Sequence, residues 1–95
     1  MTDSTIVNVL IPALLRNYCG GAREFELSAA TVRGALDELK RDHPGLYGGI
    51  CHETGDVRRH INVFVNSAHI RDLDGLDTPL TTGDVLTFLP AVSGG

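Results

Sequence analysis

Val85-Leu86-Thr87-Phe88-Leu89-Pro90-Ala91-Val92-Ser93-Gly94-Gly95 closes the sequence, and this stretch decides how the remaining residues are interpreted. Its first half is rich in branched and aromatic residues, as β-strands are. Because side chains alternate along a strand, Leu86 and Phe88 fall on one face and Leu89 falls on the other. We therefore expect a strand whose inner face packs against a helix of the same domain.

The end of this stretch, residues 89–95, is expected to form an extended and flexible tail. Pro90 has no N–H to donate to a neighbouring strand, so sheet pairing is expected to stop there. Gly94 and Gly95 lack Cβ atoms, which allows another protein to close tightly around them. A carboxylate on Gly95 is therefore the first candidate for a reactive group, and a chance glycine pair is the alternative.

The composition fits a single globular domain that spans residues 1–95. Of these residues, 42 % are hydrophobic and 21 % are charged, which is ordinary for a soluble protein. No segment approaches the roughly 20 uninterrupted apolar residues that a membrane-spanning helix requires. The opening Met1-Thr2-Asp3-Ser4 is acidic where a secretory signal is basic. We therefore expect a cytoplasmic protein with no membrane partner.

The charge and the cysteines exclude several classes of site. The formal net charge of -4 disfavours nucleic acid as a partner, because a phosphate backbone binds a concentrated cationic surface. Cys19 and Cys51 lack the spacing of a disulfide framework or a zinc site, so both are expected to be reduced. Cys51-His52-Glu53 is either a metal-binding cluster or a loop thiol beside two exposed polar residues. The second interpretation is favoured, and no metal is expected.

Alternating apolar residues predict further strands upstream of the last one. The first two are expected to form a hairpin with Phe25 and Leu27 on its buried face. These strands cover residues 5–11, 23–27 and 61–66, with a short strand near 68–70.

One main helix is predicted after Thr31, whose side chain suits an N-cap. His43-Pro44-Gly45 is expected to end this helix. Residues 46–60 are glycine-rich and aperiodic, so we expect an irregular connection there, with or without a short helical turn. The apolar residues at helical spacing are Val32, Ala35, Leu36 and Leu39.

Five different short motifs follow one another along the chain: Ile11–Arg16, Thr31-Val32, Ile61–Asn66, Leu80 with Gly83-Asp84, and Leu89–Gly95. Their order resembles the ubiquitin-like β-grasp fold and, within it, the ThiS/MoaD family of sulfur carrier proteins. The resemblance implies an α+β fold in which a mixed four- to five-stranded sheet packs on one main helix. The Ile-Pro-x-x-Leu-Arg opening and the Asn-Val-Phe-Val-Asn strand are most similar to CysO-type carriers, and MoaD-type carriers share much of the same pattern.

The resemblance implies that the chain is a sulfur carrier and not itself an enzyme. An E1-like enzyme would use ATP to adenylate the carboxylate of Gly95, with Gly94 beside it, and a sulfur donor would convert the adenylate to a thiocarboxylate. A downstream synthase would accept the sulfur, with cysteine synthesis as the favoured pathway. The sequence has no glycine-rich phosphate loop followed by lysine. We therefore expect ATP to bind the enzyme and the chain to hold no cofactor.

Recognition by these enzymes is expected to use the face of the sheet opposite the helix. Leu89 and Phe64 are the candidate anchors there, because exposed apolar patches mark interfaces. Pro90 and Val92 belong to the tail that would enter the enzyme. Arg16 either contacts a partner or only decorates the surface.

Two other functions use the same tail. A protein modifier would join its activated C-terminus to lysines of other proteins. A MoaD-type small subunit would insert its tail into the large subunit of molybdopterin synthase. All of these functions need the same unhindered ending, so the sequence leaves both alternatives open.

Overall fold

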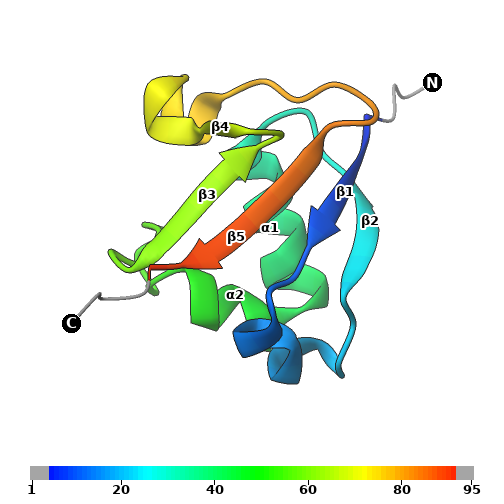
Figure 1. Cartoon of the computed structure of the whole chain (residues 1–95), viewed down its shortest axis with the longest axis vertical. Helices are drawn as coiled ribbons and strands as arrows, with labels where there is room; N and C mark the ends of the chain where they lie inside the picture. The colour runs from blue at the N-terminus through cyan, green and yellow to red at the C-terminus, as the bar shows by residue number, and fades with distance from the viewer. Residues whose placement is uncertain (1–4, 92–95) are drawn as a thin grey trace.

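The computed structural model describes residues 5–91, which form an α+β fold around one mixed sheet. Figure 1 shows α1 and α2 behind the sheet, so that the opposite face of the sheet is turned toward the viewer. The strands are β1 (Ile6–Leu10), β2 (Glu24–Ser28), β3 (Ile61–Val65), β4 (Ala68–His69) and β5 (Val85–Pro90). The α-helices are α1 (Val32–Asp42) and α2 (Pro44–Ile50), and the 3-10 helices are η1 (Ala13–Cys19), η2 (Ile70–Asp72) and η3 (Gly75–Asp77).

The sheet has five strands in the order β2-β1-β5-β3-β4. β1 and β2 form the expected antiparallel hairpin, and β3 pairs antiparallel with both β4 and β5. Within residues 5–91 the pairing of β1 with β5 is the one parallel pairing. The last strand is therefore inserted in the middle of the sheet (Figure 1), and the predicted mixed sheet is confirmed.

The core lies between this sheet and the two helices. Leu86 and Phe88 of β5 are fully buried, which confirms the inner face expected for this strand. α1 contributes the apolar residues that recur at helical spacing, as predicted. The fully buried core residues include Val7, Val9, Val32, Ala35, Leu39, Leu46, Ile50, Leu86 and Phe88.

The start of α1 follows the prediction. The side-chain Oγ1 of Thr31 accepts a hydrogen bond from the Gly34 N–H at 3.0 Å. This bond satisfies an amide that has no partner inside the helix. A Cβ on Gly34 would lie 3.4 Å from the same Oγ1. This is an ordinary van der Waals distance, so the cap does not require glycine at this position.

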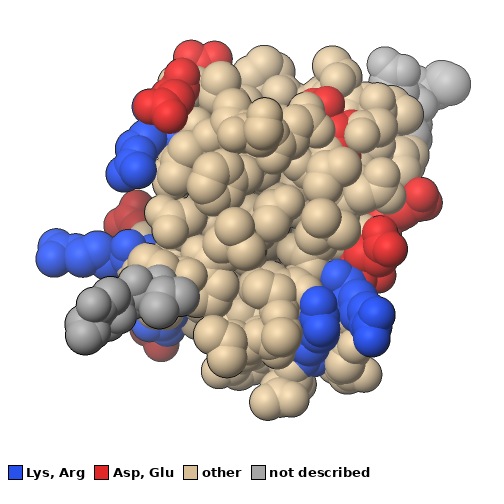
Figure 2. Space-filling view, in the orientation of Figure 1, with Lys and Arg blue, Asp and Glu red and all other residues tan. Residues whose placement is uncertain are grey.

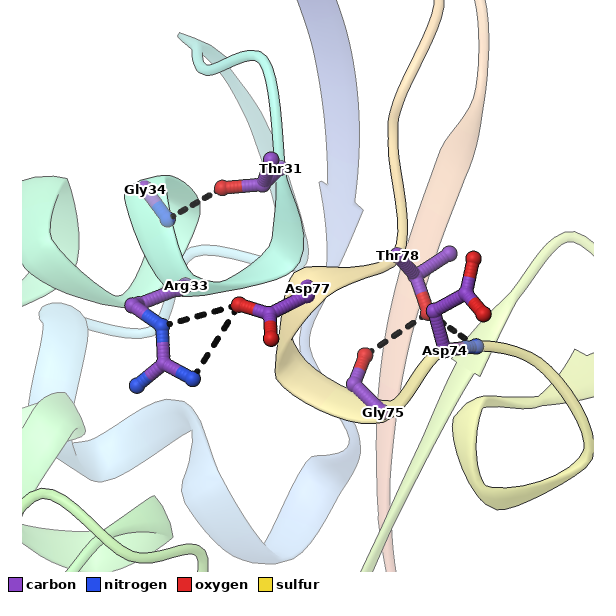
Figure 3. A network of polar contacts seen from close by, with 7 residues as sticks. All are labelled: Thr31, Arg33, Gly34, Asp74, Gly75, Asp77 and Thr78. Carbon is purple, nitrogen blue, oxygen red and sulfur yellow. Dashed lines mark hydrogen bonds and ion pairs between the residues drawn. The ribbon is translucent and has the colours of Figure 1, made fainter.

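Thr78 holds the turn that leads from η3 back to β5. Its buried hydroxyl donates to the Gly75 carbonyl at 2.7 Å and accepts from the Asp74 N–H at 3.0 Å (Figure 3). Arg33 of α1 forms an ion pair of 3.2 Å with Asp77, but both side chains are mostly exposed. Exposed ion pairs contribute little, so the buried hydroxyl matters more for fixing η3.

His43-Pro44-Gly45 ends α1 as expected, and Pro44 also begins α2, which extends into the connection where a short helical turn was left open. The His43 N–H caps α1 by donating to the Leu39 carbonyl at 2.7 Å. Proline suits the first position of the next helix, where its missing N–H would have no partner. α2 adds Leu46 and Ile50 to the core. Among the described residues no helix is long and apolar enough to cross a membrane.

The expectation that pairing stops at Pro90 is wrong. Pro90 lies within β5 opposite Ile61, and the Ala91 N–H donates to the His60 carbonyl. Along an antiparallel pair, alternate residues direct their N–H groups to the partner strand. Pro90 occupies a position whose N–H would face away from β3, where β1 has already ended, so no hydrogen bond is lost. The flexibility expected of residues 92–95 concerns positions outside the described ones.

Cys51 follows α2 and belongs to the core. Its side chain is 1 % exposed, whereas His52 and Glu53 are exposed, so the three side chains do not converge. Burial raises the pKa of the Cys51 thiol to about 11, because a thiolate would lose its hydration there. Between residues 5 and 91 no three or more metal-ligating side chains gather in one place.

Burial predicts that the same Leu→Ala truncation has a large effect on stability at one position and a small effect at another. Leu39→Ala removes a fully buried side chain and should lower the free energy of unfolding by about 2–5 kcal/mol. Leu14→Ala truncates a side chain that is 72 % exposed. It should change the free energy of unfolding by no more than about 0.5 kcal/mol. Urea denaturation followed by circular dichroism measures both values. Equal effects of the two variants would contradict the packing of α1.

Alkylation should separate the two cysteines. The Cys51 thiol is buried and stays protonated well below its pKa of about 11, and the thiolate is the reacting form. Cys19 is only partly buried. Iodoacetamide at about pH 8, followed by peptide mass spectrometry, should label Cys19 in the native protein and Cys51 only after urea is added. Similar labelling of both thiols without urea is the contrary result.

Candidate functional site

The predicted anchors lie on the outer face of the sheet, which is the face away from the helices. Residues directly opposite each other on paired strands point to the same side. Leu10, Thr87 and Phe64 form one row across β1, β5 and β3. Leu89 lies two residues farther along β5, opposite Asn62. The structure therefore places Leu89 and Phe64 on one face.

This face is apolar and partly open to solvent. Leu10 and Leu89 are 37 % and 43 % exposed, and Phe64 is half-buried. Figure 2 looks onto the face and shows mainly uncharged residues, with the charged side chains near its borders. Such a surface is typical of an interface, because a partner that covers it removes apolar area from water. We call Leu10, Phe64, Thr87 and Leu89 the outer patch.

His69 of β4 fixes the position of Phe64. The two rings meet edge to face with centroids 5.1 Å apart. The Nδ1 atom of His69 accepts a hydrogen bond from the backbone N–H of Arg71 at 3.1 Å. In the neutral ring the proton is then on Nε2, which donates to Oδ1 of Asn62 at 3.1 Å. Both ring nitrogens are therefore occupied, and His69 forms a fixed border of the outer patch.

The contact of Phe64 with His69 was not predicted, although the sequence contains a signal for it. β3 and β4 are joined by the two-residue loop Asn66-Ser67, in which Asn66 has φ 57°. Asparagine tolerates this conformation, which tight hairpin turns require. Such a loop sets the second residue before it opposite the second residue after it, and these are Phe64 and His69.

The other candidate residues are distributed differently. Pro90 lies opposite the buried Ile61, so its ring faces the helix side of the sheet and not the outer patch. Arg16 lies in η1, where its Nε donates to the Ile11 carbonyl at 3.0 Å. This bond ties the guanidinium to the backbone just past the end of β1. Three candidates lie outside the described residues, namely Val92, Gly94 and Gly95.

The chain leaves the sheet at the border of the outer patch. Leu89 faces outward, Pro90 follows it, and the N–H of Ala91 donates to the carbonyl of His60, one residue before β3 begins. We call this pairing of Ala91 with His60 the exit point. The path of the chain is therefore fixed by the sheet up to Ala91.

Known proteins match almost the whole chain. The model of the ThiS family matches residues 9–95. The sulfur carrier protein CysO of Mycobacterium tuberculosis is 33 % identical over 91 residues, which are 94 % of this chain and 98 % of the relative.

Solved structures of related proteins have the same fold over almost the whole chain. In the crystal structure of the BexX/CysO complex of Amycolatopsis orientalis, the matching chain has a TM-score of 0.84 and 39 % identity, with 94 % of this chain and 99 % of that chain covered. The solution structure of small archaeal modifier protein 1 from Methanosarcina acetivorans has a TM-score of 0.86 and 32 % identity, with 99 % and 100 % covered. The chain is therefore a member of the ThiS family of sulfur carrier proteins and has the ubiquitin-like β-grasp fold.

Proposed function

We propose that the carboxylate of Gly95 is adenylated by an E1-like enzyme and then converted to a thiocarboxylate that donates sulfur in biosynthesis. The observation that carries this proposal is the family match, because it extends to Gly95 and includes the Gly-Gly ending. The similarity to a sulfur carrier over 94 % of the chain supports the same function.

Activation is necessary because a carboxylate is a poor electrophile. Its charge is shared by two oxygens, and its leaving group would be oxide. One carboxylate oxygen attacks the α-phosphorus of ATP, and pyrophosphate leaves. Sulfur supplied at the oxidation level of sulfide then attacks the acyl carbon, and AMP leaves. The result is a thiocarboxylate with the sulfur bound to the carbonyl carbon of Gly95.

The chain contributes access and recognition to this reaction, and the enzyme binds the ATP. Gly94 and Gly95 place no Cβ beside the reacting carbon, so the donor and the acyl group can be aligned in a narrow cleft. The outer patch docks on the enzyme near that cleft, since Leu89 lies close to the exit point. The complex of a CysO relative with BexX supports docking of this fold on another protein.

The thiocarboxylate then passes its sulfur to a downstream synthase, and the similarity to CysO supports a cysteine-type pathway.

A modifier function is the second candidate, and the likeness to an archaeal modifier protein supports it. The two functions share the adenylate and differ in the group that attacks it. Attack by sulfide gives the thiocarboxylate of a sulfur carrier, whereas attack by a lysine amine gives the isopeptide bond of a modifier.

Intact mass spectrometry of the chain after incubation with the E1-like enzyme, ATP and sulfide tests the proposal. The wild-type chain should gain the mass difference of one oxygen replaced by sulfur. Gly95→Ala should lower the yield at least about tenfold, because the added Cβ obstructs alignment, and deletion of both terminal glycines should abolish it. Gly48→Ala is the matched control, since a Cβ at Gly48 has no neighbour within 4 Å.

Two results would change the conclusion. Normal conversion of the chain without its terminal glycines would refute the proposal. Branched Gly-Gly remnants on lysines of other proteins, with no sulfur-containing product, would favour the modifier.

Leu89→Asp tests the outer patch. A buried carboxylate at the centre of an interface is costly, so the dissociation constant for the E1-like enzyme should rise at least about tenfold in isothermal titration calorimetry. Tyr18→Asp is the matched control, because Tyr18 is also exposed, at 52 %, but lies in η1 beside Gly45 and Gly49 of α2. Both variants should keep the wild-type circular dichroism spectrum. Unchanged affinity of Leu89→Asp would exclude the outer patch from the interface.

A further inference from the structure

We infer that a cationic groove beside the exit point docks an acidic segment of the activating enzyme. The inference rests on the proposed function, because it assigns a second contact to the same partner. We call this surface the arginine groove. It lies between β3 and the η2–η3 segment and has a volume of about 440 Å³. Its charged border includes Arg58, Arg59 and Arg71, and its apolar wall includes Ile61, Ile70 and Leu76.

The arginine groove lies where the edge of the sheet is uncovered. β4 pairs only with Phe64 and Val65 of β3. Ile61, Asn62 and Val63, which form the earlier part of β3, line the groove instead. A partner segment can therefore lie along this part of β3 without displacing an element of the fold.

The groove and the exit point share the start of β3. Arg59 directly precedes His60, whose carbonyl accepts the hydrogen bond from Ala91. Asn62 lines the groove and lies opposite Leu89 of the outer patch. A protein that holds the chain after Ala91 and covers Leu89 is therefore positioned to reach the arginine groove as well.

The positive charge of the groove is local. Asp56 is the one acidic residue among its lining residues, against three arginines, while the whole chain carries a formal net charge of -4. The ion pairs found within residues 5–91 use Arg33 and Arg41 instead. Figure 2 shows Lys and Arg side chains projecting at the side of the molecule where β3 begins.

Arginine chemistry suits an acidic protein segment as the occupant. The planar guanidinium binds a carboxylate through two parallel hydrogen bonds. Nε of Arg58 already donates to the Gly48 carbonyl at 2.8 Å, which orients this side chain. The apolar wall accepts the aliphatic parts of a peptide, and the negative net charge of the chain disfavours a nucleic acid. Complementary charge at the border of an interface mainly speeds association and sets register.

Charge reversal tests the inference. The double variant Arg59→Glu/Arg71→Glu changes two exposed side chains, so folding should be retained. The enzyme's KM for this variant is measured by ATP–pyrophosphate exchange. It should rise at least about tenfold at low salt, while kcat changes less than about twofold. Arg59→Lys/Arg71→Lys should raise KM less than the charge reversal does, because the charge is kept while the paired hydrogen bonds of the guanidinium are lost. The matched control is Arg23→Glu, which lies just before β2 at the opposite edge of the sheet.

A titration with a defined probe separates this inference from the proposed function. Hexaglutamate peptide should shift the backbone amide signals of Arg59, Asn62 and Arg71 in nuclear magnetic resonance spectra, and the double charge reversal should abolish these shifts. An unchanged KM of the double variant overturns the inference, as does a response to inorganic phosphate with none to the peptide. A wild-type chain that supports no exchange overturns the proposed function, and the peptide titration still decides whether the groove binds acidic chains.

Discussion

The parallel pairing of β1 with β5 is the constraint on which the remaining structure depends. It inserts the last strand between β1 and β3, so that β5 is hydrogen-bonded on both sides. The inner side chains of β5, Leu86 and Phe88, are consequently at the centre of the core. Because β5 cannot move without opening the sheet, the place where the chain leaves the domain is held as firmly as the core itself.

Alternation along β5 separates the side chains that build the core from those that remain open to solvent. Inward residues pack on α1 and α2, and outward residues form the outer patch beside the exit point. The buried Cys51, with the raised pKa of its thiol, belongs to the stabilising side. His69 belongs to the other side, where its two hydrogen bonds fix the border next to Phe64. The domain therefore presents a preformed surface, and residues 5–91 bring together no group of three or more potential metal ligands.

Local patterns predicted most of the fold, because alternation and capping are properties of short segments. They predicted the hairpin, the cap at Thr31 and the two faces of β5. α2 was foreseen only as an optional short turn, because Pro44 follows one helix and begins another, and only packing of the following residues decides between these roles. Pairing beyond Pro90 depends on where β1 ends. The arginine groove combines residues from separate segments, which no local pattern brings together.

The choice of arginine in the groove has a chemical consequence for an activated terminus. An acyl-adenylate is consumed by aminolysis, and a lysine amine is a nucleophile whenever it loses its proton. A guanidinium keeps its proton at every physiological pH and does not attack acyl groups. Lys40 is the single lysine of the sequence, and it lies on α1 with its Nζ 5.8 Å from the centre of the Tyr47 ring. In the proposed reaction, the cations that line the groove attract carboxylates and do not attack the mixed anhydride of the adenylate.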